Sequence, residues 1–266
     1  MVVIRIGVIG MVGSCPGGAE GNQAADATVS PVLSSPAVRL VVLWDVDGTL
    51  LRAGDLGITV FDDAVEEVCG RPPPARVAMS GKTDPQIVGE YLAMMGIEDT
   101  ATMVAAVCDA LARHLAASAD TLVAKGALCP GSAEVLARLA ALDGVVCTAL
   151  TGNIAPNAAV KLAAFGLDRW LDLTVGAYGS DARDRRALVP IALGRTADRY
   201  GAAVEASRAW VVGDTPRDLE CAVAGGVRCL LVGTGRTPAS TLATLGADAV
   251  YEDLRDTEAV LATLLG

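Results

Sequence analysis

Two aspartates with one residue between them, Asp45 and Asp47, come directly after the apolar segment 39–44. Gly48 and Thr49 follow, and an Asp-Gly pair commonly forms a turn. A carboxylate at such a position can attack phosphorus and form an aspartyl-phosphate. A second acid two residues further on can protonate the leaving alcohol and then activate water. The pair therefore predicts nucleophilic chemistry at the end of a strand, and an ordinary strand-end turn is the alternative.

Polar residues follow a second apolar segment in the same way. Thr151, Gly152 and Asn153 come directly after residues 145–150, and a helical pattern opens at Pro156. A hydroxyl and backbone N–H groups beside the start of a helix form an anion-binding site. A simple helix cap is the alternative interpretation.

Asp214 and Asp218 form the third polar group, after the apolar segment 209–212. They lie four residues apart across a turn into a helix that opens at Pro216. Carboxylate oxygens are hard ligands that suit Mg²⁺, which takes few protein carboxylates and keeps several waters. The alternative is that Asp214 or Thr215 only caps this helix.

The elements that must position these groups alternate along the chain. Short apolar strands are predicted at 39–44, 145–150, 209–212, 229–232 and 248–251, with a weaker candidate at 171–175. Helical patterns lie between them, at 156–165, 188–200 and 216–224, and a further helix opens at Pro238. Continuous apolar strands alternating with helices predict a doubly wound α/β fold with a mostly parallel sheet. Ligands of such sheets bind beyond the carboxyl ends of the strands, so we expect the three polar groups to meet there.

Residues 53–124 interrupt this alternation. They carry only helical patterns, at 59–68, 85–95 and 100–119, which predicts an inserted all-helical cap. The α/β core then consists of residues 37–52 and 125–266. Residues 1–36 are rich in Gly, Ala, Ser and Pro and are predicted to form a poorly ordered N-terminal extension.

Two other readings of this N-terminal segment fit less well. A secretory or lipid-attachment signal would need a longer apolar stretch and more basic residues. A dinucleotide-binding loop at Gly7, Gly10 and Gly13 lacks the helix that should follow it.

Composition narrows the class of protein. The chain has 266 residues, 21 Lys+Arg against 31 Asp+Glu and a net charge of −10, which disfavours nucleic acid and anionic membranes as general partners. With 52% hydrophobic and 20% charged residues it can bury a sizeable core. The single histidine, His114, disfavours histidine-based triads and zinc sites. Seven scattered cysteines without a Cys-x-x-Cys pair, and no apolar run long enough to span a membrane, lead us to expect a cytoplasmic protein.

Taken together, the three groups resemble motifs of the haloacid dehalogenase-like superfamily, in particular its phosphoglycolate-phosphatase-like members with a helical cap. Asp45-x-Asp47-Gly48-Thr49 is similar to the first motif, Thr151-Gly152-Asn153 to the second, and Gly213-Asp214-x-x-x-Asp218 to the fourth. The similarity covers about residues 38–252.

The resemblance implies a role for each matching residue. Asp45 would be the nucleophile and Asp47 the general acid and base. Thr151, with the backbone of Gly152 and Asn153, would hold the phosphate. The implied cofactor is Mg²⁺, which Asp45, the backbone carbonyl of Asp47 and Asp214 would hold, with Asp218 in support.

The chain departs from this family at the third motif, where similar enzymes carry a lysine. Residues 184–190 read Asp-Arg-Arg-Ala-Leu-Val-Pro and contain none. A positive charge is still needed to balance the carboxylates and the phosphoryl group. Lys161 is the first candidate, Arg185 or Arg186 is the second, and Lys161 as a merely solvated charge remains a further possibility.

The cap segment contains Ser80-Gly81-Lys82-Thr83-Asp84, a loop that could face the phosphate site when the cap closes. Lys82 is a candidate for binding a substrate carboxylate or phosphate. Thr83 or Asp84 would instead cap the helix that opens at Pro85.

The predicted function is that of a Mg²⁺-dependent phosphatase, which hydrolyses a small organic phosphomonoester through an aspartyl-phosphate. The expected partner is thus a small phosphorylated metabolite. A phosphosugar mutase of the same superfamily would share the catalytic residues and is the main alternative. A non-catalytic ligand-binding protein that kept the fold is a second alternative.

Overall fold

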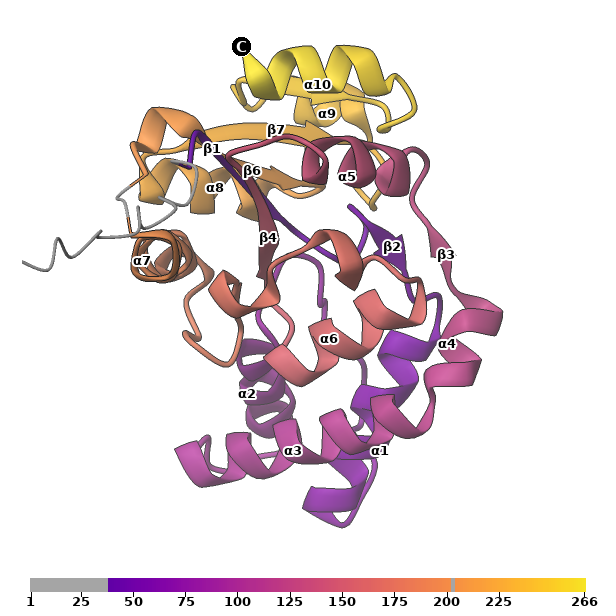
Figure 1. Cartoon of the computed structure of the whole chain (residues 1–266). Helices are drawn as coiled ribbons and strands as arrows, with labels where there is room; N and C mark the ends of the chain where they lie inside the picture. Colours follow the sequence, from indigo (N-terminus) through magenta and orange to yellow (C-terminus); the bar gives the residue numbers. More distant parts are fainter. Residues whose placement is uncertain (1–37, 202–203) are drawn as a thin grey trace, which may run out of the picture. The chain divides into compact units, whose positions relative to one another are not determined.

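A six-stranded sheet forms the centre of the computed structural model, which describes residues 38–201 and 204–266 (Figure 1). The strand order is β5-β4-β1-β6-β7-β8, and every neighbouring pair is parallel. The strands are β1 (Leu40–Trp44), β4 (Val145–Thr151), β5 (Ala177–Tyr178), β6 (Ala209–Gly213), β7 (Arg228–Val232) and β8 (Ala249–Tyr251). The predicted α/β fold with a parallel sheet is confirmed. The extension predicted for residues 1–36 lies outside the described residues.

Helices cover both faces of this sheet, as the side chains of β1 illustrate. Leu40, Val42 and Trp44 enter an apolar cluster that includes residues of α5 (Ser132–Ala140), α6 (Ala155–Ala164) and α10 (Thr257–Leu265). Val41 and Leu43 enter a second cluster with α7 (Leu188–Tyr200), α8 (Pro216–Gly225) and α9 (Ala239–Leu242). Successive side chains of a strand point to opposite faces, so an all-apolar strand needs a cover on each side.

One expected strand is wrong. Residues 171–175 alternate apolar and polar side chains, yet residues Leu173–Val175 form a 3₁₀ turn. The cause is Asp172, whose side chain accepts a hydrogen bond from the backbone nitrogen of Thr174 at 3.0 Å and so bends the chain. The strand on this side of the sheet is β5, two residues further on.

Four helices lie between two short strands, β2 (Leu51–Arg52) and β3 (Ala127–Leu128), which pair antiparallel. We call them the cap helices: α1 (Leu56–Cys69), α2 (Asp84–Met94), α3 (Ala101–Ala117) and α4 (Ala119–Lys125). They share an apolar cluster of their own, which also reaches Ile154 at the start of α6. The helix predicted over residues 100–119 is present as α3, and the chain turns at Ser118 into α4, which the sequence did not predict. The division into core and cap at residues 53 and 124 stays a prediction.

The six cysteines of the described chain are all free thiols, and burial raises the pKa of Cys147 to about 12. Among the described residues, no helix combines the length and apolarity that a membrane span requires. A cytoplasmic location stays a prediction.

Candidate active site

The carboxyl ends of β1, β4 and β6 open into a cavity of about 330 Å³, which residues of the cap segment line on its other side. Asp45 follows β1, Thr151 ends β4 and Asp214 follows β6, and all three line this cavity. Parallel strands bring their carboxyl ends to one edge of the sheet. This arrangement gathers residues that lie between 63 and 169 positions apart along the chain.

Three acids form a buried cluster at this edge. Oxygen atoms of Asp45, Asp214 and Asp218 lie within 4.8 Å of one another, and each side chain is buried. Burial, together with the neighbouring acids, raises the pKa of Asp45 to about 7 and that of Asp214 to about 9. Carboxyl groups this close in a poorly solvated place repel as anions and favour a cation between them.

Arg185 balances part of this negative charge. Its Nη2 atom donates to Oδ1 of Asp45 at 2.7 Å and to Oδ1 of Asp218 at 2.5 Å. The guanidinium is itself buried, and the two acids raise its pKa despite its burial. Its Nε has no hydrogen-bond partner among the described residues. One fixed cation therefore faces three acids, which leaves the cluster short of positive charge.

Asp218 is already occupied by protein groups. Its Oδ2 atom accepts hydrogen bonds from the backbone nitrogen of Thr215 at 2.9 Å and from the hydroxyl of Thr215 at 2.7 Å. Its Oδ1 atom accepts from Arg185. The predicted cap of the helix after β6 is thus present as a reciprocal capping box. With both oxygens taken, Asp218 is suited to supporting a metal site rather than to filling a coordination position.

The carboxylate of Asp214 lies close to the backbone of two glycines, Gly48 and Gly235. A Cβ atom on Gly48 would lie 2.5 Å from Oδ2 of Asp214, and Gly48 has a φ of +93°. A Cβ on Gly235 would lie 1.6 Å from the same oxygen. Thr49 donates from its hydroxyl to Oδ1 of Asp214 at 3.3 Å. Glycine is needed at position 48 both for its backbone angle and for the space that the carboxylate takes.

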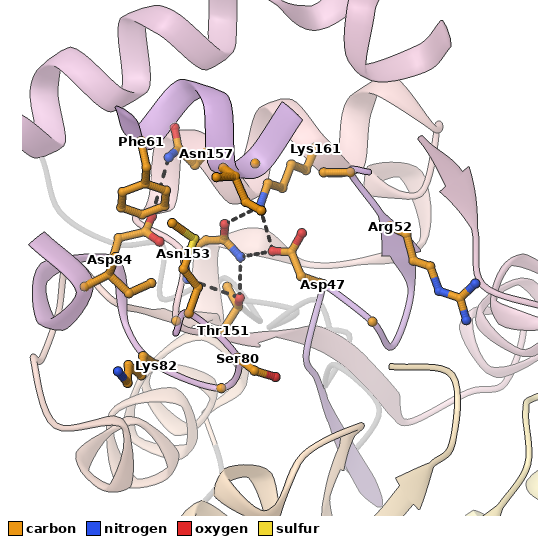
Figure 2. Close-up of a pocket in the computed structure, with 18 of the residues that line it drawn as sticks. Asp47, Arg52, Phe61, Ser80, Lys82, Asp84, Thr151, Asn153, Asn157 and Lys161 are labelled. Atoms are coloured by element: carbon orange, nitrogen blue, oxygen red, sulfur yellow. Dashed lines mark hydrogen bonds and ion pairs between the residues drawn. The ribbon is translucent and has the colours of Figure 1, made fainter. Parts of the chain in front are cut away.

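A second polar network joins Asp47, Thr151, Asn153 and Lys161, as Figure 2 shows. Lys161 donates from Nζ to Oδ2 of Asp47 at 2.6 Å and to Oδ1 of Asn153 at 2.7 Å. Asn153 donates from Nδ2 to Oδ2 of Asp47 at 2.7 Å and to the hydroxyl oxygen of Thr151 at 2.8 Å. The backbone nitrogen of Asn153 also donates to that oxygen. Thr151 thus accepts in each of these bonds, and its own proton is available for a ligand.

The loop before α2 rests directly on the residues after β4. The backbone nitrogen of Asp84 donates to the carbonyl of Gly152 at 2.7 Å. A Cβ atom on Gly152 would lie 2.0 Å from the carbonyl oxygen of Lys82, so a glycine is required there. Nζ of Lys82 donates to Oε2 of Glu90 at 2.5 Å, and its side chain points away from Asp47 in Figure 2.

Most of the residues singled out from the sequence line this cavity. They are Asp45, Asp47, Gly48, Lys82, Thr151, Gly152, Asn153, Lys161, Arg185 and Asp214. Thr49 and Asp218 lie behind them and contact Asp214 and Arg185. Arg186, the other arginine considered for the third motif, is exposed and pairs with Asp184. Both remaining candidates for the missing lysine are therefore in contact with acids of the first motif: Arg185 with Asp45, and Lys161 with Asp47.

Two polar residues that line the cavity, Asp84 and Asn157, had no catalytic or binding role assigned from the sequence. Asp84 is buried, and its Oδ2 atom accepts from the backbone nitrogen of Ile154 at 2.8 Å and from Nδ2 of Asn157 at 3.4 Å. Burial raises the pKa of Asp84 to about 6. Its sequence context, between Thr83 and Pro85, indicates a helix start and nothing more. Asp84 and Asn157 meet because α2 packs near α6. A single sequence carries no signal for this contact between distant helices.

Comparison with known proteins places the chain in a family. The haloacid dehalogenase-like hydrolase family matches residues 42–222, more than half of the chain. A phosphoglycolate phosphatase of Rhodospirillum rubrum is 31% identical over 225 residues, which cover 80% of this chain and 86% of that protein. The chain belongs to the haloacid dehalogenase-like hydrolases, and the predicted family and the predicted enzyme class are confirmed.

Solved structures share the fold. CbbY from Rhodobacter sphaeroides in complex with phosphate aligns with a TM-score of 0.61 and 20% identity, over 85% of this chain and 99% of that chain. A hydrolase from Pseudomonas syringae aligns with a TM-score of 0.60 and 20% identity, over 84% of this chain and 97% of that chain. These similarities concern the fold, and at 20% identity they do not identify a substrate.

Proposed function

We propose that the chain is a Mg²⁺-dependent phosphatase, which hydrolyses a small organic phosphomonoester through an aspartyl-phosphate on Asp45. One observation carries the proposal: Asp45, Thr151 and Asp214 line the same cavity, and Asp45 and Asp214 belong to one cluster of acids. A nucleophile, a phosphate-binding group and a candidate cation site therefore share one space. Family membership and a relative named as a phosphatase support the same conclusion.

The residues at the acid cluster fit a Mg²⁺ ion. Three buried carboxylates face a single guanidinium, and burial, together with the neighbouring acids, raises the pKa of Asp45 and of Asp214. Asp45, Asp214 and the backbone carbonyl of Asp47 would hold the ion, with Asp218 in support. Mg²⁺ supplies charge neutralisation and polarises phosphoryl oxygens when it is bound.

The chemical steps follow from the positions of the side chains. A carboxylate oxygen of Asp45 attacks phosphorus, and the bond between phosphorus and the ester oxygen breaks. Asp47 gives a proton to the departing alcohol and then takes one from the water that attacks the phosphoenzyme. The products are the alcohol, inorganic phosphate and the free Asp45 carboxylate. The side chain of Asp47 is 41% exposed, so it can reach both an ester oxygen and water.

The two cations divide the task expected of the third-motif lysine. Lys161, held by Asn153, faces the cavity beside Asp47 and is placed to meet phosphoryl oxygens. Arg185 bridges Asp45 and Asp218 and fixes the orientation of the nucleophile. Fixed charges that need no rearrangement during the reaction are what stabilises a transition state of this kind.

The leading test is phosphate release from para-nitrophenyl phosphate, measured with Mg²⁺ and after chelation. Asp45→Asn should lose turnover and keep the thermal unfolding midpoint, because the change removes the nucleophile and little volume. Asp143→Asn, an exposed aspartate outside the cavity, is the matched control. Borohydride reduction during turnover should convert a phosphorylated Asp45 to homoserine, which mass spectrometry detects. Equal rates for wild type and Asp45→Asn would reject the assigned chemistry.

The mutase alternative is tested in the same assay. A mutase passes through a doubly phosphorylated sugar, so it must bind a second phosphate at the far end of the cavity. With a hexose phosphate as substrate, we expect release of inorganic phosphate and no isomerised sugar phosphate.

A further inference from the structure

The cavity has two walls of different chemistry. The wall that belongs to the α/β core carries the catalytic acids, the phosphate-binding residues and the cations. The wall that belongs to the cap segment is largely apolar, and its apolar members are Ile58, Val60, Phe61, Met79, Ile87, Leu111 and Leu115. When phosphate sits against the core wall, the rest of the substrate must lie against this apolar wall.

Among the described residues that line the cavity, Lys82 is the only cation of the cap segment. Its ammonium pairs with Glu90 at 2.5 Å. The acids of the cap segment that line the cavity are Asp55 and Asp84, so the charge there is negative. An anionic group on the substrate would meet acids and aliphatic side chains under α1, α2 and α3.

Lys161 and Arg185 on the core wall are assigned to other groups. Lys161 pairs with Asp47 and is placed to meet the phosphoryl oxygens, and Arg185 is buried between its two acids. Arg52 and Arg236 are exposed, and Arg52 directs its Nε and Nη2 atoms to the carbonyl oxygen of Thr234. Both line the cavity, and both lie outside the cap segment of residues 53–124.

These features decide between two kinds of leaving group. Moving a carboxylate from water to an apolar wall without a cationic partner is strongly unfavourable. Burying an apolar group there is favourable, by roughly 25 cal/mol for each Å² removed from water. A cavity of about 330 Å³ is at the small end of ligand pockets, and it leaves room for a compact alcohol beside the phosphate.

We infer that the alcohol released by this enzyme is compact, uncharged and mainly apolar, such as an aryl or branched alkyl alcohol, and that phosphoglycolate is a poor substrate. The inference rests on the proposed phosphatase activity. It sets this chain apart from the relative named as a phosphoglycolate phosphatase, since the carboxylate of phosphoglycolate would find no cation beneath the cap helices.

The test compares kcat/KM for phenyl phosphate, isobutyl phosphate and phosphoglycolate in the wild-type enzyme. We expect both neutral leaving groups to exceed phosphoglycolate by at least about tenfold, the scale at which pockets discriminate by apolar contacts. Equal or higher kcat/KM for phosphoglycolate would overturn the inference, even though it would leave the phosphatase proposal intact.

A charge placed in the apolar wall should reverse this preference. Ile58 lines the cavity, is half-buried and is not part of the apolar cluster of the cap helices, so it tolerates substitution. Ile58→Lys should raise the ratio of phosphoglycolate to phenyl phosphate kcat/KM by tenfold or more. Val123→Lys, at an exposed position of α4 outside the cavity, adds the same charge and should leave the ratio unchanged. An unchanged ratio in Ile58→Lys would contradict the assignment of this wall.

Binding measurements separate the two proposals. If none of the three esters is hydrolysed, the phosphatase proposal fails, and calorimetric titration of phenyl phosphate and phosphoglycolate still ranks their affinities. Tighter binding of phenyl phosphate would then support the apolar wall as a binding surface. Tighter binding of phosphoglycolate would overturn the inference.

Discussion

The carboxylate of Asp84, at the start of α2, lies 2.8 Å from the backbone nitrogen of Ile154, at the start of α6. Helix α6 has no side-chain cap from its own residues. An acid from a cap helix therefore caps a core helix, and its negative charge faces the positive end of that helix dipole. Since Lys161 lies on α6, this contact couples the position of α2 to the phosphate-binding residues.

We expect Asp84→Ala to lower both stability and activity. Loss of a helix cap costs about 1 kcal/mol of the free energy of unfolding. The start of α6 would shift, so KM should rise for every substrate. Asp84→Asn keeps an acceptor oxygen and should retain most of both. Urea unfolding and steady-state kinetics measure the two effects, with Asp63→Ala, an exposed acid of α1, as control. Identical behaviour of Asp84→Ala and Asp63→Ala would exclude the coupling.

Arg185 and Lys161 should respond differently to truncation. Arg185→Ala leaves Asp45 and Asp218 buried without a counter-ion, which costs about 3–5 kcal/mol of the free energy of unfolding in comparable buried pairs. Lys161→Ala frees a half-exposed Asp47, so stability should change little while the rate falls by roughly 10²–10³. Lys125→Ala, at an exposed site of α4, serves as the control. Chemical denaturation and kcat distinguish the two roles, and a large stability loss in Lys161→Ala would contradict them.

Gly152→Ala should weaken the contact between the cap loop and the phosphate site. The added Cβ would lie 2.0 Å from the carbonyl oxygen of Lys82, so one of the two backbones must move. We expect a lower kcat/KM and a lower unfolding midpoint. Gly194→Ala, at an open position of α7, meets nothing within 4 Å and should be neutral or slightly stabilising. Wild-type kinetics in Gly152→Ala would show that this contact has no part in the reaction.

The acid cluster predicts a specific pH dependence without Mg²⁺. The pKa values of Asp45 and Asp214, about 7 and about 9, lie above the ordinary value of 3.8, so the folded state binds extra protons in this range. Stability after chelation should therefore fall as the pH rises from about 4 to 9. Added Mg²⁺ should raise the unfolding midpoint more at pH 8 than at pH 5, because its ligands must be ionised. Calorimetric melting curves at both pH values measure this, and a larger Mg²⁺ effect at pH 5 would contradict it.

Much of the fold and of the site could be predicted because the informative signals are local. An apolar strand followed by Asp45, Asp47 and Gly48 specifies both an element and a turn within a few residues. The same holds for Thr151 after β4 and for Asp214 after β6. Parallel pairing then brings these strand ends together, so residues recognised from local patterns line one cavity.

Local patterns carry no information where distant contacts decide. Nothing near Arg185 in the sequence indicates that it enters the core and meets Asp45. The sequence offers Asp84 as a cap of the helix that opens at Pro85, and its contact with Ile154 arises only when α2 packs near α6. The strand β5 has two residues between Gly176 and Gly179, too few to produce a detectable alternation.

The chain enters and leaves the cap helices side by side, through the paired strands β2 and β3, where Leu51 faces Leu128 and Arg52 faces Ala127. A segment inserted through two adjacent ends behaves as a replaceable module. A different helical segment transplanted between the same two strands would keep the phosphate chemistry and bring its own wall to the alcohol. Diversification of such an enzyme toward new esters therefore needs no rebuilding of its catalytic acids.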